Sequence, residues 1–128
     1  MTQEEKQLLI KDLCARLPYG IMVSVQGGEF DSYKYPYILT AVSKFGLDSF
    51  CRVYHAVYTP FGVPNVEDVK PYLRPMSSMT DEDWNIFDSL AREPMQIELF
   101  EWLNAHHFDY RGLIEKGLAL EALEGMYE

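Results

Sequence analysis

The chain has 128 residues and a formal net charge of −9 at pH 7, and 48% of its residues are hydrophobic. This length is typical of one domain, so we expect a single domain over residues 1–128, and the apolar content excludes intrinsic disorder. No apolar run approaches the roughly 18 residues of a membrane span, and the N-terminus lacks the pattern of a signal peptide. We therefore expect a cytoplasmic protein without a membrane segment.

The acidic residues are concentrated in the second part of the chain. Residues 1–79 carry eight basic and eight acidic side chains, whereas residues 80–128 carry three basic and twelve acidic ones. Nucleic-acid-binding proteins present basic stripes to the phosphates, and this sequence has no such stripe. Nucleic acid is therefore a disfavoured partner. The acidic part either solubilises the protein or occupies a basic groove on a protein partner.

The first predicted element is a helix over Gln3–Arg16. Thr2 and Glu5 have the spacing of a capping box, in which each side chain satisfies a free amide at the start of a helix. Pro18 forces the preceding residue out of the helical region. Helical spacing predicts one apolar face, formed by Ile10, Leu13, Cys14 and Leu17.

Three strands are predicted next, and short connections make them an antiparallel meander. Ile21, Val23 and Val25 lie on one side of the first strand and Met22 and Ser24 on the other, up to a turn at Gly27–Gly28. The second strand is expected from Tyr37 to Ser43 and the third from Phe50 to Tyr58, because aromatic and β-branched residues dominate both. Beyond a loop, residues 66–70 resemble one helical turn, which Pro71 ends. Residues 74–78 are expected to form an extended connector.

Two C-terminal helices are predicted from capping and periodicity. Thr80 and Asp83 mark the start of the first, whose apolar side contains Trp84, Phe87, Leu90 and Ala91. Pro94 suits the first turn of the second, in which Glu98 and Glu101 lie away from the apolar face. That face contains Met95, Leu99, Trp102, Leu103 and His106, and we expect Trp102 and Leu103 to be core residues.

A last short helix is predicted between Asp109, as its cap, and Gly117. With Gly117 in the left-handed conformation, Leu113 and Leu118 take the positions that touch in a Schellman motif. Residues 120–128 are expected to form a loosely docked tail. Together the elements predict an α+β fold, with an N-terminal helix, a small antiparallel sheet and C-terminal helices packed on that sheet.

Two surfaces are candidates for binding a protein partner. Tyr33, Tyr35 and Tyr37 alternate and could present a row of aromatic rings, although half-buried strand residues explain the same pattern. Glu98 and Glu101 belong to the acidic helices, whose carboxylates exceed the number that helix capping requires. Between these surfaces we favour the acidic one.

An alternative hypothesis is a small hydrolase or metal-dependent enzyme that uses His106, His107 and Asp109. Adjacent helical positions point about 100° apart, so the two imidazoles cannot face one ion unless the helix has already ended. We favour structural roles for these residues, in which His106 packs under Trp102 and His107 hydrogen-bonds the end of the helix. Because no further ligand and no catalytic motif is visible, we expect a non-catalytic protein without metal or cofactor.

Two blocks of sequence resemble a known group of proteins. The blocks are KPYLRPMSSMT, from Lys70 to Thr80, and WLNAHHFDYRGLIEKGLAL, from Trp102 to Leu120. They are similar to short proteins of unassigned function that are encoded by gut bacterial phages and related mobile elements. The resemblance implies an accessory protein of a mobile element, and it implies no catalytic residues.

Overall fold

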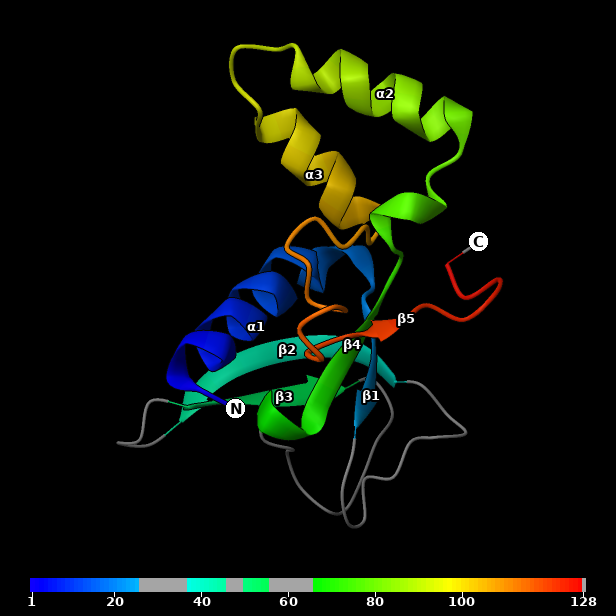
Figure 1. Ribbon diagram of the computed structural model, residues 1–128. Coiled ribbons are helices and arrows are strands. Elements are labelled where there is room, and N and C mark those ends of the chain that lie inside the picture. The colour runs from blue at the N-terminus through cyan, green and yellow to red at the C-terminus, as the bar shows by residue number, and fades with distance from the viewer. Residues whose placement is uncertain (26–36, 46–49, 56–65, 128) are drawn as a thin grey trace.

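The computed structural model describes residues 1–25, 37–45, 50–55 and 66–127. It confirms the α+β class, with three α-helices and five strands among the described residues (Figure 1). The helices are α1 (Gln3–Arg16), α2 (Asp81–Ala91) and α3 (Ile97–Ala105). The strands are β1 (Met22–Val25), β2 (Tyr37–Phe45), β3 (Phe50–His55), β4 (Val69–Leu73) and β5 (Leu120–Glu121).

The strands form a mixed sheet in the order β3-β2-β1-β4-β5. β1, β2 and β3 are successive antiparallel neighbours, which confirms the predicted meander. β4 adds to the other side of β1 in antiparallel orientation, and β5 pairs with β4 in parallel. The sequence prediction lacked both of these strands. The predicted turn at residues 27–28 and the end of the third strand at residues 56–58 lie outside the described residues.

The prediction for residues 66–78 was wrong in two places. A 3-10 turn covers Val66–Asp68, and the chain then enters β4 instead of ending a helical turn at Pro71. Pro71 lies opposite Val23, at a position where β5 has not begun, so a residue without an amide hydrogen is tolerated there. The expected extended connector instead contains a 3-10 turn at Met76–Ser78.

Helix α1 begins and ends where the sequence predicted. Both hydrogen bonds of the Thr2–Glu5 capping box are present. The buried face differs from the prediction, because Cys14 is exposed and Ile10 is only partly buried. The residues that are buried instead are Leu9, Asp12, Leu13 and Arg16. The helix is rotated toward an ion pair that lies inside the protein.

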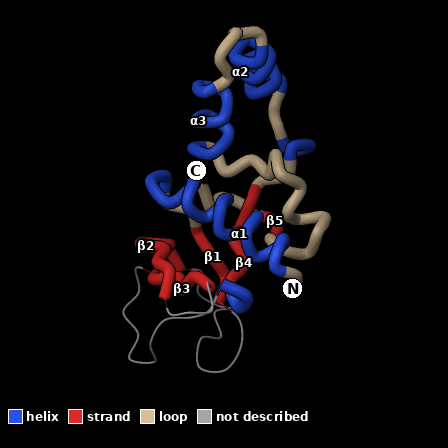
Figure 2. Tube along the Cα trace, turned by 90° about the vertical axis from the view of Figure 1, so that its left-hand side faces the viewer, coloured by secondary structure: helices blue, strands red, loops and turns tan. Residues whose placement is uncertain are grey.

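The main core lies between α1 and one face of the sheet (Figures 1 and 2). It combines side chains from α1, the strands and the segment after α3, so residues far apart in sequence meet in one cluster. Its buried members are Leu9, Leu13, Ile21, Val23, Leu39, Val66, Val69, Leu73, Leu113, Leu118 and Ala119.

Helices α2 and α3 form a hairpin that stands beyond the sheet instead of covering it, as both views show (Figures 1 and 2). The hairpin has a cluster of its own, formed by Met79, Leu99, Leu103 and Phe108. Leu103 is 2% exposed, as predicted for a core residue, whereas Trp102 is only partly buried. No residue of α2 is fully buried. It is therefore α1, and not the C-terminal helices, that packs on the sheet.

The segment after α3 follows the predicted caps but forms turns instead of a helix. The Asp109 carboxylate accepts hydrogen bonds from the backbone amides of Leu113 and Ile114 at 2.8 and 3.0 Å. Gly117 has a φ of 76°, and the Leu118 amide donates to the Leu113 carbonyl at 2.9 Å. These contacts are those of the predicted Schellman motif.

The final residues are docked on the sheet and do not form a loose tail. Leu120 and Glu121 form β5. The Tyr127 hydroxyl then donates to the Tyr72 carbonyl at 2.7 Å and accepts from the Met22 amide at 3.0 Å. One side chain therefore bonds the backbones of two neighbouring strands, β1 and β4.

Candidate functional site

The hairpin surface, by which we mean the exposed part of residues 81–105, combines negative charge with apolar side chains. These residues include seven acidic side chains and a single basic one, Arg92. Contiguous apolar residues on the surface of a monomer mark interaction sites. The large hydrophobic residues exposed here are Trp84, Ile86, Met95, Ile97 and Phe100.

A groove of about 520 Å³ lies where the two helices join, and we call it the hairpin groove. Its apolar residues are strongly exposed: Met95 is 70% and Ile97 57% exposed. Glu98 and Glu101, two of the residues predicted to bind a partner, line it as well. The full lining is Glu93, Pro94, Met95, Ile97, Glu98 and Glu101.

The groove residues remain exposed because α3 uses its other side for packing. Leu99 and Leu103 belong to the hairpin cluster, and the groove residues Ile97, Glu98 and Glu101 lie outside it. Within the part of the chain that the structure describes, Glu98 and Glu101 form no ion pair. These carboxylates are therefore available to cationic groups of a partner.

The aromatic row proposed from the sequence is only partly described. Tyr33 and Tyr35 lie outside the described residues. Tyr37, the first residue of β2, is partly buried and packs against the main core. Its role in the core accords with the structural explanation of the tyrosine pattern.

The structure separates the roles of His106, His107 and Asp109. The His106 ring is exposed and lies on Trp102, with 4.9 Å between the ring centroids. His107 is 3% exposed, and the Asp109 carboxylate caps the following turn. Within the described ranges, no three His, Cys, Asp or Glu side chains are placed to hold a metal ion. His106, His107 and Asp109 therefore do not form one metal site.

A buried ion cluster, formed by Asp12, Arg16 and Arg111, connects α1 to the segment after α3. The Arg16 Nε donates to both Asp12 carboxylate oxygens at 3.0 and 3.1 Å, and both side chains are fully buried. The Arg111 Nη1 reaches the same carboxylate at 2.7 Å. The Arg16 Nη2 donates to the carbonyl of Phe108, a member of the hairpin cluster, at 2.6 Å. The cluster thus fixes the base of the hairpin to the body of the protein.

His107 points into the protein because the chain turns there, two residues after the end of α3, in the left-handed conformation with a φ of 60°. The His107 amide donates to the Asn104 carbonyl, and the Phe108 amide donates to the Leu103 carbonyl. These two hydrogen bonds form a Schellman motif, in which His107 takes the left-handed position that glycine usually occupies. The His107 ring lies 4.1 Å from the Tyr127 ring. The turn therefore places an imidazole beneath the docked C-terminal segment.

Acid is expected to destabilise the fold through His107. Burial, and then the charge of Arg16, lower the pKa of His107 from 6.5 to about 4, despite a hydrogen bond to the Tyr19 backbone. Between these two pKa values the unfolded chain binds a proton that the folded protein excludes. This contribution is present above pH 6.5 and is lost as pH falls to 4, with a total of about 3 kcal/mol. Urea unfolding at a series of pH values measures the loss.

His107→Asn is the matched variant, because asparagine tolerates the left-handed conformation and does not titrate. Carboxylates such as Glu67, whose pKa is lowered by Lys6, titrate in both proteins, so the difference between the two pH profiles isolates His107. The variant is expected to have the shallower profile. Identical profiles, or an NMR titration of the His107 ring with its midpoint near 6.5, would contradict the prediction.

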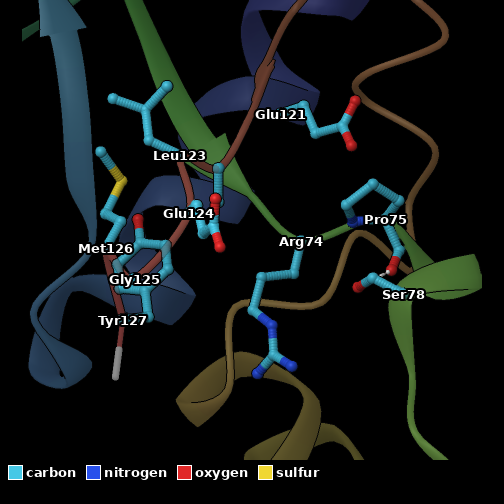
Figure 3. A pocket seen from close by; sticks show the side chains of 10 residues that line it. Arg74, Pro75, Ser78, Glu121, Leu123, Glu124, Gly125, Met126 and Tyr127 are labelled. Atoms are coloured by element: carbon cyan, nitrogen blue, oxygen red, sulfur yellow. Dashed lines mark hydrogen bonds between the residues drawn. The ribbon is translucent and has the colours of Figure 1, made fainter.

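A second pocket, of about 240 Å³, lies between the end of β4 and the C-terminal segment (Figure 3). Arg74 points away from Glu121, and its guanidinium lies 4.2 Å from the centre of the Phe108 ring. The Ser78 hydroxyl donates to the Pro75 carbonyl at 2.6 Å. The two hydroxyls that line this pocket, those of Ser78 and Tyr127, both donate to backbone carbonyls, of Pro75 and Tyr72, and not to a side-chain base.

The site with the best-defined chemistry is therefore the hairpin groove, an apolar depression bordered by carboxylates. No helix within the described ranges combines the length and apolar character that crossing a membrane requires. Comparisons of the chain with protein-family models, with curated proteins and with solved structures found no match.

Proposed function

We propose that this chain is a non-catalytic protein-binding module that holds its partner with the α2–α3 hairpin. The observation that carries the proposal is the hairpin surface itself, on which Met95 and Ile97 are exposed beside the carboxylates of Glu98 and Glu101. An apolar patch with polar residues at its rim is the usual composition of a protein interface. The ion cluster under the hairpin supports this role, because it fixes the binding surface on the body.

The charge of the hairpin indicates the kind of partner. Seven acidic residues against one basic residue repel nucleic acid and anionic surfaces and attract a basic protein surface. Attraction of this kind increases the rate of association and selects among partners. Binding should therefore weaken with salt, since exposed charges are screened over about 8 Å at physiological ionic strength.

The proposal includes a biological setting. The resemblance of residues 70–80 and 102–120 to short proteins of phages and mobile elements favours an accessory factor that acts on a host protein in the cytoplasm. An acidic surface that occupies a basic groove is a suitable means of interference, because such grooves on host proteins normally bind phosphates.

The proposal is tested by purifying the tagged protein from its own host and identifying what binds to it. The variant Glu98→Lys/Glu101→Lys reverses two charges at the groove. Glu115→Lys/Glu124→Lys makes the same change at exposed positions outside the hairpin. Wild type and control are expected to retain one partner in comparable amounts, and the hairpin variant is expected to lose it.

Two results would refute the proposal. One is a partner that binds the hairpin variant as well as the wild type at both low and high salt. The other is the absence of any stoichiometric partner under conditions in which the protein is folded.

A further inference from the structure

We infer that the hairpin groove binds a basic amphipathic segment of the partner, with an apolar anchor side chain in the groove and Lys or Arg on either side of it. This inference rests on the proposed function and adds the chemistry of the bound segment. It concerns the six residues that line the groove, and not the acidic character of the protein as a whole.

The arrangement of the lining residues carries the inference. Met95 and Ile97 are the most exposed apolar residues of the hairpin, and both line the same depression as Glu98 and Glu101. A partner's apolar side chain that entered here would remove both residues from water. Cationic side chains beside it would meet the carboxylates of Glu98 and Glu101, which form no ion pair with any other described residue.

Contacts at the turn and along α3 position the backbone that carries the groove residues. The Gln96 side-chain amide donates to the Ala91 carbonyl at 3.2 Å and so connects the start of α3 to the end of α2. Leu99 and Leu103 hold α3 in the hairpin cluster. A protein whose binding surface is already ordered loses less conformational entropy on binding than one whose surface must first become ordered.

Charge excludes the main competing occupants. A second copy of this chain carries a net charge of −9 and would bring carboxylates toward carboxylates if hairpins met. An anionic lipid surface or an acidic peptide would be repelled by Glu93, Glu98 and Glu101 in the same way. A neutral apolar segment would leave these carboxylates without partners, so a basic amphipathic segment is the best match.

The test uses three fluorescently labelled synthetic peptides and the intact protein. The first is an amphipathic helix of leucine and lysine, the second replaces lysine by glutamate, and the third replaces leucine by serine. Fluorescence anisotropy measures their affinities. The leucine–lysine peptide is expected to bind at least about tenfold more tightly than either control, since each control lacks one of the two interactions.

Variants then locate the binding site. Ile97→Ser and Met95→Ser remove apolar contacts without changing charge, and each is expected to weaken the leucine–lysine peptide by about tenfold. Glu98→Lys/Glu101→Lys should abolish binding, and Glu115→Lys/Glu124→Lys should preserve most of it. Serine is tolerated near a helix start, and circular dichroism verifies that the variants are folded. NMR shift changes on adding the peptide are expected at residues 93–101.

The outcomes separate this inference from the proposed function. Equal binding of the leucine–lysine and serine–lysine peptides, or full binding by Ile97→Ser and Met95→Ser, would show attraction by charge alone and overturn the inference. NMR shifts confined to another surface would do the same. In each case, loss of the host partner by Glu98→Lys/Glu101→Lys would still support the proposal that the hairpin binds a protein. Retention of that partner would refute the proposed function itself.

Discussion

Arg16→Met is expected to destabilise the protein by about 3–5 kcal/mol, as removal of one member of a buried ion pair does. Arg16 and Asp12 are both fully buried, so the variant leaves a buried carboxylate whose remaining charged partner is Arg111. It also leaves the Phe108 carbonyl without the hydrogen bond from Arg16. Urea unfolding monitored by circular dichroism measures the change in the free energy of unfolding.

Lys11→Met is the matched control, because it removes one positive charge from an exposed position of the same helix. Its effect is expected to stay within about 0.5 kcal/mol. The double variant Asp12→Leu/Arg16→Met removes both fully buried charges and should recover part of the lost stability. Arg111 then lacks its carboxylate partner, but its side chain is partly exposed and reaches water. A loss below about 1 kcal/mol for Arg16→Met would contradict the buried position of this pair.

Tyr127→Ala is expected to cost about 3–5 kcal/mol, comparable with the removal of a large core side chain. The variant removes the ring that lies on His107 and the hydroxyl that joins Met22 to Tyr72. The Met22 amide and the Tyr72 carbonyl then lose a partner, which adds to the cost. Thermal unfolding measures the total, and hydrogen exchange of the Met22 amide is expected to accelerate.

Tyr127→Phe separates the two contributions, because it keeps the ring and removes only the hydroxyl. Its cost is expected to be about 1–3 kcal/mol, the cost of leaving buried backbone groups unpaired. Unchanged stability of both Tyr127 variants would instead support the loosely docked tail that the sequence predicted.

Local signals in the sequence predicted both ends of α1, the start of α2 and the turn contacts of Asp109 and Gly117 correctly. Capping boxes at Thr2 and Thr80 involve contacts within three residues, so they depend little on the rest of the fold. The same is true of Asp109 and Gly117, whose partners lie within a few positions. The meander was predictable because alternation and turn residues are also local properties.

The two strands that the sequence did not predict, β4 and β5, depend on contacts between distant parts of the chain. Pro71 argued for the end of a helical turn, and only the pairing of β4 with β1 and the late start of β5 make proline acceptable there. β5 contains only two residues, Leu120 and Glu121, and is recognised as a strand only because it pairs with β4. A two-residue strand carries no recognisable periodicity in a sequence.

The buried ion cluster could not be inferred from composition. Asp12 and Arg16 have the spacing of an ordinary surface ion pair on a helix, and charged residues are almost never fully buried. Their burial depends on Phe108 and Arg111, about a hundred positions further along the chain. The one local hint is that both charges share a face with Leu9 and Leu13.

The candidate groove was predicted in part. The charge excess and helical spacing indicated Glu98 and Glu101 as exposed residues, and the structure places both at the groove. The apolar residues of the groove were not predicted. The sequence pattern placed Pro94 in the first turn of the helix and Met95 on its buried face. The helix begins at Ile97 instead, so Met95 lies before it and is exposed.

The long sequence separation of the contacts that close the main core has a consequence for biosynthesis. Asp12 binds Arg111, 99 positions further along the chain, and the Met22 amide binds Tyr127, 105 positions further along. During translation the first helix and strand therefore leave the ribosome long before the residues that complete their environment. A nascent chain that has not yet reached Tyr127 leaves the Met22 amide and the Tyr72 carbonyl without their side-chain partner, so this part of the sheet is completed late in synthesis.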